Sequence, residues 1–220
     1  MIKSGATEFT LFTFGGGRHY PGEFDDMATE VLEQPTEERL VRRRATAEEF
    51  WSLPESVLPV EYVNGEIVMA PTPTVPHQRA TFWMASVLQQ FVIQNRLGEI
   101  FISPLDVVLP TGAVVQPDIF FLDPRQAARA RTARRVTDTP PFLIEILSPS
   151  SIAHDTITKR ALYEKNGVRE YWIVDVEKRS VAQLVLRKKH YALTELGEAD
   201  VIKGVVLAGF ETAVGGLLGA

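Results

Sequence analysis

The chain has 220 residues, 45% of them hydrophobic, with a formal net charge of −5 and no cysteine, which predicts one domain with a terminal extension. The missing cysteine excludes disulfides, thiolate metal sites and cysteine nucleophiles, and is typical of a cytoplasmic protein. The negative charge is unusual for a non-specific nucleic-acid binder, and the sequence holds no 18-residue apolar run that would predict a membrane span.

The first 45 residues differ from the rest of the chain. They include a run of three glycines and show no sustained apolar period. We therefore expect an irregular extension over residues 1–45, with a short helix near 36–43. Thr46 and Glu49 have the spacing of a capping box, which predicts a short helix at the start of a domain that spans residues 46–220.

A hairpin and a long helix are predicted next. Asn64 and Gly65 suit the two positive-φ positions of a type I′ turn between two short strands. Apolar residues between 76 and 97 recur with helical spacing, and Gly98 is a suitable residue to follow a helix end.

Strands dominate the rest of the predicted fold. We expect them at EIFIS, LDVVL, VVQPDIFFLD, FLIEILS and REYWIVDV, followed by two antiparallel strands. The apolar run FLIEILS is typical of a central strand that is covered on both faces. A partly helical loop is expected over 125–136 and a helix over 152–166. This order predicts an α/β (α+β) fold in which helices flank a mixed β-sheet.

Two acids stand in apolar strands. Glu145 lies within FLIEILS and shares a strand face with Leu143 and Leu147. A buried carboxylate is costly unless it is paired, hydrogen-bonded or bound to a metal. Asp118 starts the apolar strand that follows Pro117. A structural ion pair is the alternative explanation for Glu145, and a strand-edge acid bonded to the backbone or paired with an arginine is the alternative for Asp118.

The helix after FLIEILS carries Asp155, Lys159 and Tyr163 on one face. An exposed Asp–Lys pair would be ordinary. If this face instead points at the strand ends, two carboxylates and a lysine form a metal-assisted hydrolase site. Hard oxygen ligands favour Mg²⁺ or Mn²⁺, and a lysine can orient water or offset charge on a phosphate.

Four blocks of the sequence resemble a known family. They are VNGEIVMAPTPTVPH, QPDIFFLD, PPFLIEILSPSS and DTITKRALYEKNGVREYWIVD. In their order and spacing they are similar to the Uma-two family of restriction endonucleases, in the PD-(D/E)xK nuclease superfamily. The likeness covers roughly residues 46–218.

The resemblance implies a restriction-endonuclease-like core and a set of site residues. Asp118 and Glu145 take the positions of the two metal-binding acids. Leu147 stands where the superfamily pattern has its lysine, and Lys159 matches the lysine that this family carries on the following helix. Glu66 and His77 are implied as supporting catalytic groups, and Gln116 and Asp155 as outer groups.

The leading hypothesis is a Mg²⁺-dependent endonuclease that acts on DNA and forms a homodimer. The arginine-rich segment 125–135 is the predicted phosphate-contacting patch, although a solvated surface loop explains it as well. Two alternatives stay open. One is a nuclease fold that binds nucleic acid or protein without catalysis, and the other is a two-carboxylate glycosidase, which lacks an aromatic sugar platform here.

Overall fold

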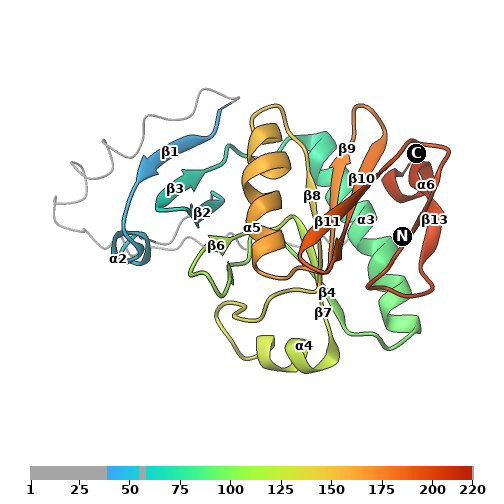
Figure 1. Ribbon diagram of the computed structural model, residues 1–220, viewed down its shortest axis with the longest axis horizontal. Coiled ribbons are helices and arrows are strands. Elements are labelled where there is room, and N and C mark those ends of the chain that lie inside the picture. The colour runs from blue at the N-terminus through green and yellow to red at the C-terminus, as the bar shows by residue number, and fades with distance from the viewer. Residues whose placement is uncertain (1–38, 55–57, 220) are drawn as a thin grey trace, which may run out of the picture. The chain divides into compact units, whose positions relative to one another are not determined.

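The computed structural model describes residues 39–54 and 58–219. Two main sheets organise this part of the chain (Figure 1). The first has five strands in the order β1-β3-β2-β6-β5, and every neighbouring pair is antiparallel. Its strands are β1 (Val41–Arg44), β2 (Val60–Val63), β3 (Glu66–Met69), β5 (Val107–Val108) and β6 (Val114–Val115).

The second sheet has six strands in the order β11-β10-β9-β8-β7-β4. Only β8 and β9 run parallel; the other pairs are antiparallel. Its strands are β4 (Glu99–Ile102), β7 (Ile119–Leu122), β8 (Phe142–Ile146), β9 (Glu170–Asp175), β10 (Ser180–Arg187) and β11 (His190–Leu196). A small third sheet joins β12 (Val201–Lys203) to β13 (Glu211–Ala213). The predicted mixed sheet with flanking helices is confirmed.

Six helical segments complete the described chain. They are α2 (Ala47–Trp51), α3 (Val75–Gln94), α4 (Pro124–Ala130), the π-helix η1 (His154–Lys159), α5 (Arg160–Lys165) and α6 (Val214–Leu218). The predicted capping box of α2 is present, because the Thr46 and Glu49 side chains each bond to the other's backbone N–H. No helix in the described ranges is long and apolar enough to cross a membrane.

The segment before α2 departs from the prediction of an irregular chain with a helix near 36–43. Residues 41–44 form β1, which pairs with β3 along its whole length. A tertiary contact explains this difference, because the hairpin of β2 and β3 leaves an open edge with which a neighbouring extended segment can pair. The hairpin itself is confirmed: Asn64 has φ 53° and Gly65 has φ 76°, as a type I′ turn requires. The rest of the predicted extension, residues 1–38, lies outside the described residues.

The predicted strand VVQPDIFFLD is wrong as a single element. It divides into β6 in the first sheet and β7 in the second, with Gln116, Pro117 and Asp118 between them. Pro117 has no N–H to give to a ladder, which favours a break at this point. The break places Asp118 at the crossing between the two sheets.

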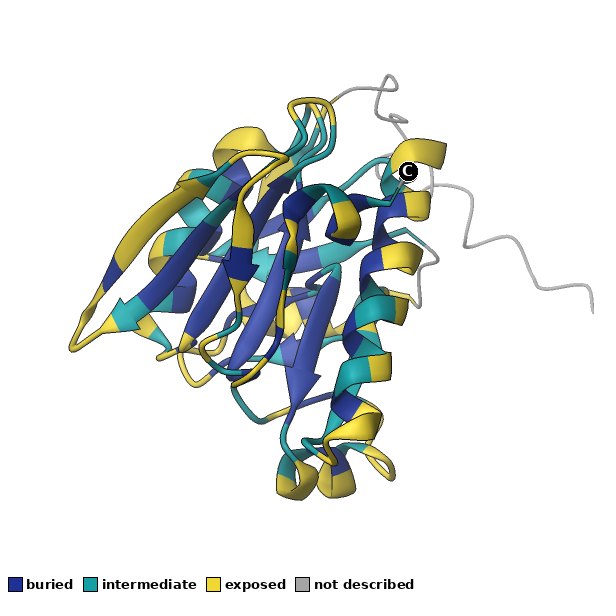
Figure 2. Cartoon of the chain, turned by 90° about the vertical axis from the view of Figure 1, so that its right-hand side faces the viewer, coloured by how far each residue is buried: buried dark blue, intermediate teal, exposed yellow. Residues whose placement is uncertain are grey.

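The central strands of the six-stranded sheet, β7, β8 and β9, are buried on both faces, whereas the edge strand β11 is mostly exposed (Figure 2). One face, which carries Ile144 and Ile146, packs against α3 and the C-terminal segment. The other face, which carries Leu143, packs against α5 and residues of the first sheet. Figure 1 shows α5 and α3 on opposite sides of β8. The apolar tail belongs to the core on the α3 side, where Val214, Leu217 and Leu218 are buried.

The end of α3 corrects the role predicted for Gly98. The left-handed residue after the helix is Arg96, with φ 55°. Gly98 serves a different purpose, because a Cβ at this position would lie 2.0 Å from the carbonyl oxygen of Leu122. Glycine is therefore needed here so that the chain can pass close to the end of β7.

Candidate functional site

A buried lysine lies among three carboxylates. The Nζ atom of Lys159 is 2.9 Å from Glu145 Oε1, 2.9 Å from Glu61 Oε1 and 3.5 Å from Asp155 Oδ1. All four residues are at most 6% exposed. The expectation that Lys159 faces the acids is thus met by the geometry. We call Lys159, Glu61, Glu145 and Asp155 the acid–lysine cluster.

The charges in the acid–lysine cluster do not balance, since one ammonium faces three carboxylates. Burial, with the charges of Asp155, Asp118 and Glu61, raises the pKa of Glu145 well above its usual value despite Lys159. Burial likewise raises the pKa of Asp155. For Lys159, burial disfavours the ammonium, but Glu145 and Glu61 outweigh it and raise its pKa. The cluster would therefore gain from additional positive charge.

Glu61 behaves differently from Glu145 although both touch the same lysine. Burial opposes its ionisation, but Lys159, together with hydrogen bonds from His154 and the backbone N–H of Gln116, lowers the pKa of Glu61 to about 2. Glu145 Oε1 accepts from Lys159 and, at 2.6 Å, from the Tyr163 hydroxyl. The two acids thus differ in pKa, which is lowered for Glu61 and raised for Glu145, although both contact the same ammonium.

The π-helix η1 brings two side chains five residues apart to the same acid. His154 Nε2 lies 2.8 Å from Glu61 Oε2, and Lys159 Nζ lies 2.9 Å from Glu61 Oε1. In a π-helix the hydrogen bonds run from i to i+5, so residues with this spacing share a face. The wider turn also keeps Asp155 buried beside Lys159. Local π-helical turns are frequent at functional sites.

Asp118 joins the strands β7 and β8 to the start of α3. Ile119 pairs with Ile144 in the antiparallel register, and continuing that register places Asp118 opposite Glu145. Asp118 Oδ2 accepts from the backbone N–H of Ile146 at 2.8 Å and lies 3.2 Å from His77 Nε2. Burial disfavours the charged imidazole, but Asp118 outweighs it and raises the pKa of His77. His77 is therefore placed beside Asp118, as the prediction of a supporting group requires.

Glu66 does not lie with the other predicted site residues. Its side chain is 35% exposed, and its ion pair is with Arg42, at 3.5 Å. Glu61, on the preceding strand, holds the buried position instead. Glu61 shares its strand face with Val63, which is 1% exposed, so the alternation of β2 points both inward. That alternation is the signal in the sequence that would have favoured Glu61 over Glu66.

Sequence reasoning also missed His154 and Arg42. Arg42 Nη2 lies 3.0 Å from His154 Nδ1. A guanidinium can only donate, so Nδ1 accepts and Nε2 carries the proton that His154 donates to Glu61. Contacts thus run from Arg42 on β1 through His154 and Glu61 to Lys159. No local sequence pattern predicts this chain of contacts, because Arg42 is 112 residues from His154.

Gln116, predicted as an outer group, connects the cluster to the first sheet. Its backbone N–H donates to Glu61 Oε1 at 2.9 Å, and its side-chain Nε2 donates to Asp106 Oδ1 at 2.8 Å. Its side-chain Oε1 is buried and has no hydrogen-bond partner among the described residues. Gln116 therefore holds Glu61 in place from the break between β6 and β7.

The arginine-rich segment 125–135 is largely engaged within the protein. Arg129 pairs with Asp138 at 2.7 Å, Arg131 pairs with Glu99, and the Arg135 guanidinium lies 4.0 Å from the centre of the Trp51 ring. These contacts limit the positive charge that the segment can offer to a phosphate backbone. On β1, Arg43 and Arg44 are exposed.

The donor chemistry of the site suits a hard cation. Within the described ranges, no group of three or more His, Asp or Glu residues is arranged to enclose a metal ion. Mg²⁺, however, is usually held by only one or two carboxylates, with water and substrate phosphate completing its shell. Asp118 and Glu145 come from opposed strand positions and supply such a pair. The hydrogen bonds given above involve Asp118 Oδ2 and Glu145 Oε1. Asp118 Oδ1 and Glu145 Oε2 take no part in these bonds.

Comparisons with known proteins agree on the fold and the family. The chain matches none of the curated proteins compared. Among solved structures, it resembles a protein from Anabaena variabilis described as a "putative nuclease belonging to DUF820", with a TM-score of 0.70 and 21% identity. The match covers 79% of this chain and 97% of that one. The model of the Uma2 family, described as "Putative restriction endonuclease", matches residues 47–215, and the chain therefore belongs to the Uma2 family.

Proposed function

We propose that this protein is a Mg²⁺-dependent endonuclease that hydrolyses DNA phosphodiester bonds, with Mn²⁺ able to replace Mg²⁺. The observation that carries the proposal is the burial of Lys159 beside Glu145, with Asp118 directly before the neighbouring strand β7. Membership in a family described as restriction endonucleases supports it. So does the likeness to a structure described as a nuclease.

Asp118 and Glu145 are the residues that would hold the ion. When bound, Mg²⁺ polarises a phosphoryl oxygen and lowers the pKa of a coordinated water. The raised pKa of Glu145, caused by burial and by the acids around it, fits this assignment, because a cation would favour its charged form. Asp118 is already oriented by the backbone N–H of Ile146.

Lys159 is the group that would act on the reacting atoms. Its ammonium can orient a water or offset charge that develops on the phosphate. Glu61 keeps the lysine in place without competing for the ion, since two further donors already engage Glu61. His77 would orient Asp118 through their contact and add positive charge beside the phosphate.

Supercoiled plasmid tests the proposal directly. We expect nicking or linearisation with Mg²⁺ or Mn²⁺, and none with EDTA or with Glu145→Gln. Glu195→Gln is the matched control, because Glu195 is exposed on β11 and lies outside the acid–lysine cluster. DNA binding without cleavage in every metal would favour the alternative of a non-catalytic binding module. Equal cleavage by the wild type and Glu145→Gln would contradict the proposed mechanism.

Arg42→Met is expected to reduce cleavage about tenfold, because Arg42 orients His154, which in turn holds Glu61 beside Lys159; the size is set by analogy with groups that orient metal ligands. Without Arg42 as a donor to Nδ1, the His154 imidazole can carry its proton on Nδ1 instead of Nε2. This change removes the hydrogen bond that Nε2 donates to Glu61. Nitrogen-15 NMR of His154 would report the tautomer, and a cleavage assay the rate. Arg43→Met, one residue along β1 and exposed, is the control. Equal rates for both variants would show that the Arg42–His154 contact has no part in the reaction.

A further inference from the structure

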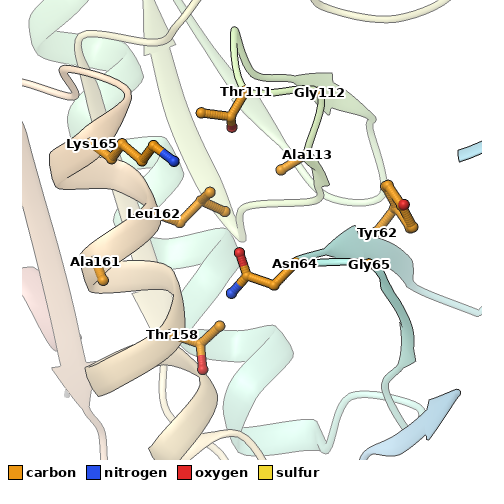
Figure 3. A pocket seen from close by; sticks show the side chains of 10 residues that line it. All are labelled: Tyr62, Asn64, Gly65, Thr111, Gly112, Ala113, Thr158, Ala161, Leu162 and Lys165. Atoms are coloured by element: carbon orange, nitrogen blue, oxygen red, sulfur yellow. The ribbon is translucent and has the colours of Figure 1, made fainter. Parts of the chain in front are cut away.

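A hollow lies behind the acid–lysine cluster. It has a volume of about 310 Å³ and opens between one helical segment and two turns (Figure 3). The helical wall runs from Thr158 to Lys165, and the turns are those at 62–65 and 111–113. In Figure 3 the Asn64 side chain points toward the helix, and the Lys165 ammonium points back across the hollow. We call it the α5 pocket.

The walls of the α5 pocket suit a polar, negatively charged ligand. None of the ten lining residues is acidic, although the chain has a net charge of −5. Within the described ranges, the side chains of Asn64, Thr158 and Lys165 have no hydrogen bond or ion pair with protein groups. The pocket thus offers an ammonium, an amide and a hydroxyl that are free to bind a ligand.

The α5 pocket is held open by contacts outside it. Asn166 ties the 111–113 turn to the end of α5, accepting from the Thr111 N–H and donating to its hydroxyl, both at 3.1 Å. The Tyr62 hydroxyl donates to the Ala45 carbonyl at 3.2 Å, and Phe50 packs 5.6 Å from the Tyr62 ring. A pocket whose walls are fixed in this way is largely formed before a ligand binds.

The α5 pocket and the acid–lysine cluster share their supporting elements. On β2, Tyr62 lines the pocket, while its neighbour Glu61 contacts Lys159 on the other face. On the helix, Thr158 lines the pocket next to Lys159. A group bound in the pocket therefore lies against the reverse side of the same strand and helix that carry the site.

We propose that the α5 pocket binds one phosphate-bearing nucleotide. Lys165 receives the phosphate, Asn64 and Thr158 hydrogen-bond the sugar or base, and the Tyr62 ring provides a surface against which the base packs. The volume lies at the lower end of ligand pockets and fits a single nucleotide. The nucleotide is either one unit of a bound strand or a free mononucleotide. In the first case the inference rests on the proposed nuclease function, and in the second it stands alone.

Binding measurements in EDTA test the α5 pocket apart from cleavage. The probes are a deoxymononucleotide, a short single-stranded oligonucleotide and inorganic phosphate, each followed by calorimetry. Lys165→Gln and Asn64→Gly are expected to weaken nucleotide binding at least fivefold; glycine keeps the positive φ that Asn64 adopts. Lys189→Gln, on an exposed lysine of the β10–β11 turn, is the control and should change the affinity less than twofold.

The probes also separate the sources of the nucleotide. A loss for the mononucleotide supports a free nucleotide as ligand, and a loss for the oligonucleotide alone supports one unit of a strand. Unchanged affinity of both variants for both probes, or equal binding of inorganic phosphate, would overturn the proposal. Failure of the nuclease function would appear elsewhere, as wild-type protein that leaves plasmid uncut in Mg²⁺.

Discussion

Lys159→Met is expected to lower the rate of DNA cleavage by about 100- to 1000-fold, the usual cost of losing one group that stabilises charge in a transition state. Methionine keeps much of the length of the side chain and removes only its charge and donors. Steady-state cleavage of a labelled duplex in Mg²⁺ measures the loss. Lys178→Met is the control, because Lys178 pairs with Asp175 on the surface and is 78% exposed.

The same change is expected to destabilise the protein by about 3 kcal/mol, since removing one partner of a buried ion pair leaves the other uncompensated. Glu61, Glu145 and Asp155 would all lose their contact with the ammonium. Urea unfolding measures this effect. Adding Glu61→Gln removes one of the buried carboxylate charges that lost its partner, so the double variant should regain stability without regaining cleavage. Recovery of cleavage in the double variant would show that Lys159 acts only as a structural cation.

Glu170→Leu is expected to reduce the free energy of unfolding by about 4 kcal/mol, because each buried donor left without a partner costs about 1–3 kcal/mol. Glu170 is completely buried in β9 and accepts four hydrogen bonds. Its donors are Trp172 Nε1 at 2.8 Å, Gln183 Nε2 at 2.7 Å, and the backbone N–H groups of Val205 at 2.8 Å and Val206 at 2.6 Å.

The loss of stability in Glu170→Leu is expected to be large because two of the four donors are backbone N–H groups. A backbone N–H cannot turn to another acceptor by side-chain rotation. Hydrogen exchange at Val205 and Val206 should quicken in Glu170→Leu, and urea unfolding should give the free energy. Glu170→Gln keeps one acceptor oxygen, so its free energy of unfolding should lie between those of Glu170→Leu and the wild type. Glu195→Leu, on the exposed face of β11, should stay within about 0.5 kcal/mol of the wild type. A midpoint for Glu170→Leu that equals that control would refute the anchoring role.

Local chemistry predicted the parts of the fold that neighbouring residues decide. Asn64 and Gly65 specify their hairpin turn, and Thr46 with Glu49 caps α2, because each depends on groups within a few residues. Strand alternation placed Glu145 on the face of Leu143, and the structure puts both on the side of α5. The family resemblance implied that Lys159 belongs to the same site, and the structure places its Nζ atom 2.9 Å from Glu145 Oε1.

The remaining features depend on contacts that are distant in sequence. β1 forms because β3 offers an edge, so its own residues did not reveal it. Glu61 was missed because a hairpin acid is commonly exposed, and only its burial against His154 and Lys159 sets it apart. The π-helical turn could not be predicted from 154–159 alone, since the acid that it serves lies on β2.

The π-helix η1 also separates what can vary in this segment from what cannot. Ile157 is 68% exposed, so its identity is of little consequence to the core or to the acid–lysine cluster. The number of residues is a different matter. Shortening the segment by one residue would return it to α-helical winding and would end the five-residue spacing at which His154 and Lys159 both meet Glu61. Natural variation in η1 should therefore take the form of substitutions and spare its length.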